Sequence, residues 1–304
     1  MTRWQANAVL VLVAAIWGSA FVAQNRAMEH MGPMAFTGLR FLLGALVVLP
    51  LAWREQRHLR SRALHHNARD AAQVAGLGLL LCGGAALQQV GVKGTTVTNA
   101  GFLTALYIPV VVLLSWWRSG QAPGRGTGLM VAGCLAGTMA LSGAGSADFH
   151  VGDLWIIASV LPWALHVLLV GEVAHRMAAP FTVASGQFLA CGLAATAWAL
   201  VAEPISAPGI ADAAWAIVFT GVLSVGVGFT AQVVAQRHTP AADAAIVLSC
   251  EVLFAAAFGF ALMGDRLTAA GWAGAALMFA CLLAVQIRAL GLDAARPAVE
   301  RQNE

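Results

Sequence analysis

Charged residues are scarce in this sequence. Only 10% of its 304 residues are charged and 60% are hydrophobic, whereas a typical soluble domain carries about a quarter charged residues. The charges also cluster between long apolar runs instead of spreading along the chain. This composition excludes an ordinary soluble globular domain and indicates a chain that lies largely within a lipid bilayer.

Groups that would support catalysis or metal binding are also sparse. The sequence has no HExxH motif, and it shows no serine–histidine or aspartate pair at facing depths that would indicate a protease inside the membrane. His65 and His66 have no acidic or cysteine neighbour at the spacing of a zinc site. The five cysteines are odd in number and fall inside apolar runs, where they suit helix packing better than disulfides. They are Cys82, Cys134, Cys191, Cys250 and Cys281. We therefore expect no enzymatic activity, no metal and no cofactor.

Long apolar runs fill most of the chain. Each is close to the ~20 residues that an α-helix needs to cross a bilayer. We predict an all-α polytopic membrane protein with ten transmembrane helices, at the following approximate limits. The runs are Ala6–Met28, Met34–Trp53, Ala71–Val92, Val97–Trp117, Gly126–Gly143, Asp153–Val173, Phe181–Ala202, Ala213–Ala235, Asp243–Met263 and Ala269–Arg288.

The basic residues predict the orientation of these helices. With both termini in the cytoplasm, the cytoplasmic segments hold thirteen of the 17 Lys and Arg residues, and the outer segments hold Arg26, Lys93 and Arg266. Such an excess follows the positive-inside rule. The basic segment Arg54–Asp70 is then a loop that sets topology, not a nucleic-acid site. We expect a multi-pass protein of a bacterial-type inner membrane.

The two halves of the chain repeat each other. PMAFTGLRFLLG at Pro33 matches PFTVASGQFLAC at Pro180, so that Arg40 corresponds to Gln187. Further matches keep the same order. They pair Trp17 with Trp163, Gln88 with Gln232, Asn99 with Asp243, and Tyr107 with Glu251. Because each unit has five helices, the second unit must enter the membrane from the opposite side, as an inverted repeat. We expect repeats at residues 1–143 and 153–288, followed by a disordered cytoplasmic tail at 289–304.

Four motifs resemble a known family. They are WGSAFV at Trp17–Val22, P-x6-RFL at Pro33–Leu42, LQQVGVKGTTVTNAGFLTALYIPVV at Leu87–Val111 and GDRLT at Gly264–Thr268. Together they resemble the EamA type of the drug/metabolite transporter superfamily. The resemblance implies a ten-helix exporter of small metabolites, amino acids or drugs. Two positions depart from the family pattern. Gly120-Gln121 stands where Gly-Glu is common, and Glu251-Val252 stands where Glu-Pro is common, which leaves helix nine without the family's kink residue.

Four side chains sit near the centre of their helices, where the substrate of a transporter would bind. Trp17 and Trp163 are out of place there, because tryptophan prefers membrane interfaces. They form an aromatic wall of the cavity or pack in the core. Glu251 is a carboxylate at mid-bilayer, which normally faces a water-filled cavity or a relay. Alternatively, Glu251 is protonated and forms a structural hydrogen bond to a neighbouring helix. Tyr107 completes this central set by the repeat alignment.

Four further residues are candidates for substrate binding. His166 lies one turn from Trp163 and serves as a substrate ligand or as a packing residue. Gln88 and Gln232 are expected near the cavity entrances. Arg40 binds a substrate carboxylate or ties helices together. Asp243, at the inner end of helix nine, we expect to be a helix cap.

These features predict a secondary transporter that exports small amphipathic metabolites by alternating access around a midplane cavity. Apolar and aromatic amino acids are the first expectation, because an aromatic wall with one acid and one imidazole suits an amphipathic solute that carries an amine. The alternatives are a multidrug exporter of lipophilic cations and a facilitative channel-like pore. The expected partners are the small-molecule substrate and the lipid bilayer, with protons left open and nucleic acid excluded. Glycine-rich faces on helices five and ten suit close packing within a monomer better than a dimer.

Overall fold

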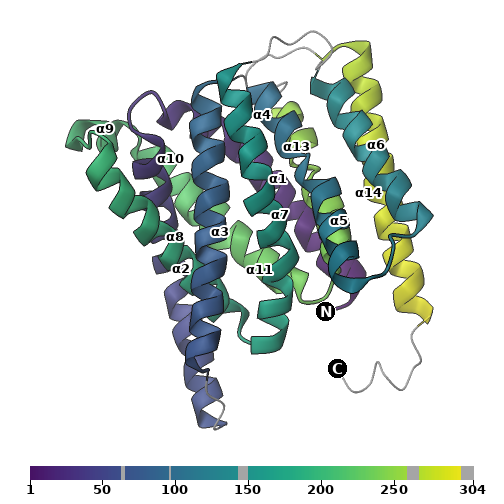
Figure 1. The fold of residues 1–304 in the computed structure, drawn as a ribbon, viewed down its shortest axis with the longest axis horizontal. Coiled ribbons are helices and arrows are strands. Elements are labelled where there is room, and N and C mark those ends of the chain that lie inside the picture. Colours follow the sequence, from purple (N-terminus) through teal and green to yellow (C-terminus); the bar gives the residue numbers. More distant parts are fainter. Residues whose placement is uncertain (63–65, 96, 143–149, 259–266, 296–304) are drawn as a thin grey trace.

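The computed structural model describes residues 1–62, 66–95, 97–142, 150–258 and 267–295, and this part of the chain is helical without strands. The helices pack as one bundle (Figure 1). The elements of the first half are α1 (Arg3–Ala27), α2 (Pro33–Ser61), α3 (Ala68–Lys93), α4 (Val97–Thr104), α5 (Tyr107–Ser119) and α6 (Arg125–Ser142). Those of the second half are α7 (Val151–Met177), α8 (Pro180–Ala202), α9 (Ala207–Asp212), α10 (Ala214–Phe219), η1 (Thr220–Phe229), α11 (Thr230–Gln236), α12 (Ala241–Leu248), α13 (Glu251–Phe258) and α14 (Ala269–Ala295).

Nine stretches of the described chain are long and apolar enough to cross a membrane. The predicted span that is not among these nine is the fifth, which corresponds to α6 and lies beside α14 at one edge of the bundle (Figure 1). Glycines make this contact close, since a Cβ on Gly137 would lie 2.8 Å from the Gly274 carbonyl oxygen. Helices five and ten are therefore peripheral, as predicted. α14 continues past Arg288 to Ala295, so the first part of the predicted disordered tail is helical, and residues 296–304 lie outside the described part.

The helix contacts follow the predicted inverted repeat. α2 packs along its counterpart α8, and α6 along its counterpart α14. The contact of α3 with α7 has its equivalent in the contact of α1 with η1 and α11. One side-chain hydrogen bond occurs twice, at opposite ends of the bundle. Thr95 donates to the Asp153 carboxylate, and Thr239, 144 positions later, donates to Asn7 Oδ1 at 2.7 Å.

Two carboxylates join α2 and α8 reciprocally at both ends. The Glu203 carboxylate, just after α8, accepts hydrogen bonds from the first N–H groups of α2, at Met34 and Ala35, each at 2.9 Å. The Glu55 carboxylate, near the end of α2, accepts from the first N–H groups of α8, at Phe181 (3.3 Å) and Thr182 (2.7 Å). Each carboxylate satisfies orphan donors and complements the positive end of a helix dipole.

Helices four and nine are both interrupted at equivalent places. The first break separates α4 from α5 and the second separates α12 from α13, so that Tyr107 and Glu251, 144 positions apart, each begin the second segment. In helix four Pro109 removes a backbone N–H, which favours the break. Helix nine lacks the family's kink residue, as the sequence shows, and is nevertheless interrupted. There the Ser249 hydroxyl bonds the Ile246 carbonyl oxygen at 2.8 Å, a local bond that competes with the helical ladder.

Helix eight departs from its counterpart in backbone geometry. Residues Thr220–Phe229 form a ten-residue π-helix, whereas the equivalent part of α3 is regular α-helix. A π-helical segment of this kind is rare and is often found at functional sites. The sequence contains no local signal for it, since its glycines and valines are equally compatible with an α-helix.

Candidate functional site

A cavity of about 50 Å³ lies in the middle of the bundle, between both halves of the chain. Seven of the eight residues predicted to bind substrate line it, which are Trp17, Arg40, Gln88, Tyr107, Trp163, Gln232 and Glu251. The other lining residues are Phe21, Gln24, Thr104, Val167, Ser224, Phe229 and Leu248. This volume holds a few water molecules, so the cavity has to widen before it can hold an amino acid.

The two tryptophans are each seated on a glycine of the opposite repeat. A Cβ on Gly84 of α3 would lie 2.8 Å from the Trp163 ring, and a Cβ on Gly228 of η1 would lie 2.9 Å from Trp17 Nε1. The two glycines are themselves 144 positions apart and are therefore equivalent. Trp17 Nε1 donates to the Ser224 carbonyl oxygen at 3.2 Å, while the buried Trp163 Nε1 has no partner among the described residues. The repeat thus places one indole from each half against the cavity.

The helix breaks bring Tyr107 and Glu251 to the cavity. Tyr107 donates from its hydroxyl to the Ala245 carbonyl oxygen at 3.2 Å, across to the segment before the second break. Glu251 is 7% exposed, and its carboxylate has no hydrogen-bond or ion-pair partner within the described part of the chain. α1 approaches here very closely, because a Cβ on Gly18 would lie 2.6 Å from the Glu251 carbonyl oxygen. A desolvated carboxylate without a partner is costly and is available to a bound cation.

Arg40 supplies the opposite charge in the same cavity. It donates to Gln24 Oε1 at 2.9 Å, and its guanidinium carbon lies 5.1 Å from the Phe36 ring centre and 5.3 Å from the Phe41 ring centre. Its Nε is buried without a partner in the described structure. Arg40 and Glu251 do not form an ion pair with each other, although both line the cavity. The cavity therefore contains one guanidinium and one carboxyl group at separate places.

The equivalent glutamines differ in their hydrogen bonding. Gln88 donates to the Thr104 hydroxyl at 3.0 Å. Gln232 is buried, and neither its Nε2 nor its Oε1 has a partner among the residues described. Both side chains line the central cavity, not its entrances as predicted. An unpaired buried amide costs free energy, so Gln232 has donor and acceptor capacity left for a ligand.

His166 is not among the residues that line the cavity. It is fully buried behind Trp163, where its Nε2 lies 2.9 Å from Gln187 Oε1. Its ring meets the Trp163 ring edge-on, with 6.4 Å between centroids. This position matches the alternative of a packing histidine, and a direct contact with substrate stays a prediction. Gln187, the counterpart of Arg40, ties the second and first helices of its repeat together as Arg40 does through Gln24.

Sequence reasoning missed Phe229, which contacts both tryptophans. Its ring centre lies 4.5 Å from that of Trp17 and 6.0 Å from that of Trp163, with the second pair nearly parallel. Phe229 has no aromatic counterpart in the first repeat, so the search for matched residues passed over it. The available signal was its position between Gly228 and Gln232, one turn from a predicted cavity residue.

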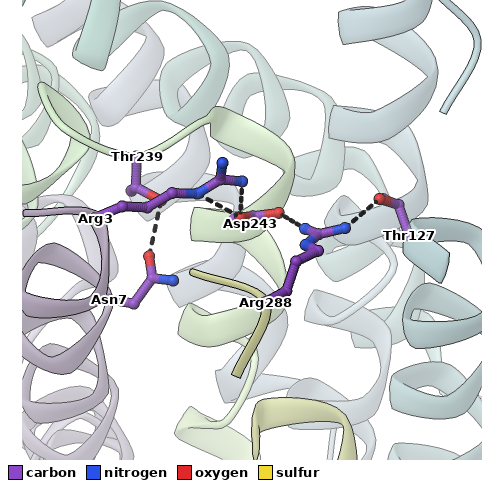
Figure 2. Close-up of polar contacts among 6 residues, drawn as sticks. All are labelled: Arg3, Asn7, Thr127, Thr239, Asp243 and Arg288. Carbon is purple, nitrogen blue, oxygen red and sulfur yellow. Dashed lines mark hydrogen bonds and ion pairs between the residues drawn. The ribbon is translucent and has the colours of Figure 1, made fainter. Parts of the chain in front are cut away.

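The bundle is closed by charged side chains at the end where α1 begins and the last turns of α14 lie, which we call the terminal face. Asp243 of α12 is 2% exposed and pairs with Arg3 of α1 and Arg288 of α14 (Figure 2). Arg288 also donates to the Thr127 hydroxyl of α6 at 2.9 Å. Asp243 therefore does more than cap its helix, because it connects helices of both repeats. We call Arg3, Asp243 and Arg288 the Asp243 cluster. It places the beginning of α1 and the last turns of α14 on one face, which the sequence predicts to be cytoplasmic.

A second, larger hollow opens beside the Asp243 cluster. It measures about 570 Å³ and is lined by the ends of α5, α7 and α11. The Arg118–Glu172 ion pair, with 2.6 Å between Nη2 and Oε2, lies in its wall. Val167 lines both this hollow and the central cavity. The hollow thus reaches from the terminal face to a wall that it shares with the central cavity.

Two segments of the chain, residues 4–143 and 150–286, match the sequence model of the EamA-like transporter family. A curated relative from Archaeoglobus fulgidus, described as an uncharacterized transporter, is 27% identical over 290 residues, which are 94% of this chain and 87% of the relative. A solved structure titled only as the crystal structure of a protein matches with a TM-score of 0.74 and 18% identity, covering 95% of this chain and 98% of its own. That solved structure shows the shared fold.

Proposed function

The chain belongs to the EamA-like transporter family, and we propose that it exports zwitterionic amino acids with apolar or aromatic side chains. As a member it is a secondary transporter of the drug/metabolite transporter superfamily and a multi-pass membrane protein. The substrate and the direction of transport are our inference from the cavity and from the resemblance of its motifs to exporters. We further propose a bacterial-type inner membrane and a monomer, whose glycine faces on α6 and α14 pack against each other.

One observation carries the substrate proposal. Arg40 and Glu251 line the same cavity and are not paired with each other, so a site with Glu251 ionised offers both charges to a ligand. A zwitterion would place its carboxylate at the guanidinium and its ammonium at the carboxylate, so each charge would gain a partner in a desolvated site. The indoles of Trp17 and Trp163 and the ring of Phe229 then suit an apolar side chain. The free amide of Gln232 can bond either end of the amino-acid backbone.

The arrangement of the chain supports alternating access. The two repeats pack against each other in equivalent ways, and broken helices with their breaks at the substrate site are typical of inverted-repeat transporters. The central cavity is too small in this structure to hold an amino acid, and Val167 lines both it and the hollow at the terminal face. We infer that substrate enters from this hollow when the Asp243 cluster separates, and leaves when the opposite ends of the helices part.

Lipophilic cations are the second candidate substrates, because the aromatic rings and Glu251 suit them as well. Arg40 argues against them, since a second cation in the same cavity would repel the ligand. A channel-like pore would conduct without exchanging one solute for another. Competition by tetraphenylphosphonium would indicate a cation exporter, and flux without exchange would indicate a pore.

The test is counterflow in proteoliposomes loaded with unlabelled L-phenylalanine, L-leucine or L-lysine. We expect labelled L-phenylalanine to accumulate transiently above equilibrium with phenylalanine or leucine inside, and not with lysine. Trp17→Ala and Trp163→Ala should each weaken the apparent affinity several-fold, since an aromatic contact contributes on the order of 1 kcal/mol beyond its buried area. Trp198→Ala is the matched control, because Trp198 is 62% exposed and faces away from the cavity. Absence of amino-acid counterflow, or equal loss in the control, would contradict the proposal.

A further inference from the structure

We propose that Phe229 limits the size of the substrate, because its ring occupies the pseudo-two-fold axis that relates the two repeats. The proposal rests on the proposed function, since it concerns the same cavity. It adds a residue that selects substrates by size and that neither the family motifs nor the repeat alignment identifies.

The ring contacts place Phe229 at this axis. Trp17 and Trp163 form one equivalent pair, and Phe229 lies 4.5 and 6.0 Å from them between ring centres. Phe41 and Phe188, 147 positions apart, form a second equivalent pair, and Phe229 lies 5.8 and 6.2 Å from them. A side chain that contacts both members of two symmetry-related pairs at similar distances must lie close to the axis itself.

An axial position explains why only one repeat supplies this ring. Two equivalent rings at the axis would overlap, because each would occupy the position of its own symmetry mate. The counterpart of Phe229 is Ala85, which is fully buried and has no side chain beyond Cβ. The backbone is asymmetric at the same place, since the π-helix Thr220–Phe229 ends at this ring while the α3 segment before Ala85 is regular.

The axial ring has a consequence for transport. If the repeats exchange conformations between the inward-open and outward-open states, side chains off the axis change their surroundings, whereas a ring on the axis stays in the cavity wall in both states. Phe229 therefore contacts the substrate throughout the cycle. It also separates the cavity from the packed Phe41 and Phe188 rings, so its removal would enlarge the cavity toward them.

The experiment compares competing amino acids of graded size. Counterflow of labelled L-leucine is measured against competition by alanine, phenylalanine, tryptophan and 2-naphthylalanine, in wild type, Phe229→Ala and Phe229→Leu. We expect both substitutions to improve competition by tryptophan and naphthylalanine relative to alanine, by about five-fold or more for Phe229→Ala. Phe219→Ala is the matched control. It also removes a phenylalanine ring, but Phe219 lies just before the π-helix that ends at Phe229 and is not among the residues that line the cavity. An unchanged size ranking in folded, transporting Phe229→Ala and Phe229→Leu would overturn the proposal.

A double variant tests the axial position itself. Ala85→Phe combined with Phe229→Ala moves the ring to the other repeat but returns it to the axis. We expect this double variant to recover the wild-type size ranking, whereas Ala85→Phe alone should lose transport because two rings then compete for one place. Recovery of folding and transport without the size limit would show that Phe229 acts through packing and would contradict size selection.

Failure of the proposed function would be recognised separately. If wild type exchanges no amino acid, the substrate proposal fails, and the same variants are compared with tetramethylammonium, tetraethylammonium and tetraphenylphosphonium. Size selection then predicts that Phe229→Ala shifts preference toward tetraphenylphosphonium, again with Phe219→Ala as control. An unchanged preference in this cation series would overturn the role of Phe229 independently of substrate class.

Discussion

At the scale of single residues, the cavity depends on groups that are expensive to bury and on residues that leave space for them. A lone carboxylate at mid-bilayer identifies Glu251 from sequence alone, because no other acidic residue lies at that depth. The sequence could not show that Arg40 reaches the same cavity, since the two residues are distant in the chain and belong to opposite repeats. In our proposal, the presence of both groups in one cavity is the reason that a zwitterion should bind better than a lipophilic cation.

We predict that Glu251→Gln alters the pH dependence of transport. The ionised carboxylate attracts the substrate ammonium, so wild-type transport should fall as the pH drops and the carboxylate becomes protonated. The amide keeps the shape and hydrogen bonding of the acid but cannot titrate, so the variant should be slower and insensitive to pH. The measurement is counterflow at a series of pH values, with the same pH inside and outside the vesicles each time. A wild-type pH profile retained in Glu251→Gln would contradict substrate binding, whereas a proton gradient that drives accumulation only in wild type would identify Glu251 as a proton carrier.

The glycines beneath the tryptophans should tolerate no side chain. Gly84→Ala places a Cβ 2.8 Å from the Trp163 ring, and such overpacking typically costs about 1–3 kcal/mol. We expect lower thermal stability in detergent and reduced counterflow, with Gly228→Ala acting similarly on Trp17. Gly76→Ala in the same helix is the control, since its Cβ would meet nothing within 4 Å and alanine favours helix by about 0.5–1 kcal/mol. Equal effects at Gly84 and Gly76 would show that the cause is helix propensity and not the tryptophan seat.

At the scale of helices, the sequence predicts most elements because apolar length and terminal prolines are strong local signals. Pro33 and Pro180 begin α2 and α8 as the pattern indicates. The break in helix nine and the π-helix were not predicted, because both depend on packing between repeats and not on a breaker residue. The reciprocal carboxylates Glu55 and Glu203 were also missed, since each acts on a helix far away in the chain.

Loss of these carboxylates should destabilise the α2–α8 pair. Glu203→Ala leaves the first N–H groups of α2 without an acceptor, and Glu55→Ala does the same for α8, so each should cost about 0.5–2 kcal/mol. Because the two sites lie at opposite ends of the pair, the effects should add in the double variant. Thermal unfolding in detergent measures this, with the exposed Glu29→Ala as control. A double variant as stable as the control would mean that water replaces the carboxylates without cost.

At the scale of the whole molecule, the inverted repeat accounts for the paired contacts, the paired breaks and the closed ends. The sequence predicts the repeat because five helices per unit force inversion. It does not predict where symmetry fails, at Phe229 and at the Asp243 cluster, since alignment of the halves finds only what they share. Phe229 lies in the one cavity that the two repeats share, and the Asp243 cluster joins the helices at only one face of the bundle.

The predicted orientation can be tested with two single cysteines in a background without the five native ones. Asp212→Cys in α9 should react with a membrane-impermeant maleimide added outside whole cells, because the arginine distribution places α9 outside. Gln121→Cys, between α5 and α6, should react only after the membrane is opened. The reverse labelling pattern would show that the predicted orientation is inverted. Labelling of both residues from outside would contradict the odd number of spans that we predict between them.

The most direct test of alternating access measures the accessibility of one cavity position from both sides of the membrane. Ser224→Cys in the cysteine-free background places a thiol in the cavity wall, and oriented vesicles allow an impermeant maleimide to be added to either face. We predict slow labelling from each face. Asp243→Asn should raise the rate at the cytoplasmic face and lower it at the other, because loss of the central charge removes the ion pairs of Arg3 and Arg288 with α12 and so favours opening of the terminal face. Labelling from one face only, in both proteins, would contradict alternating access, as would equal rates at both faces that Asp243→Asn leaves unchanged.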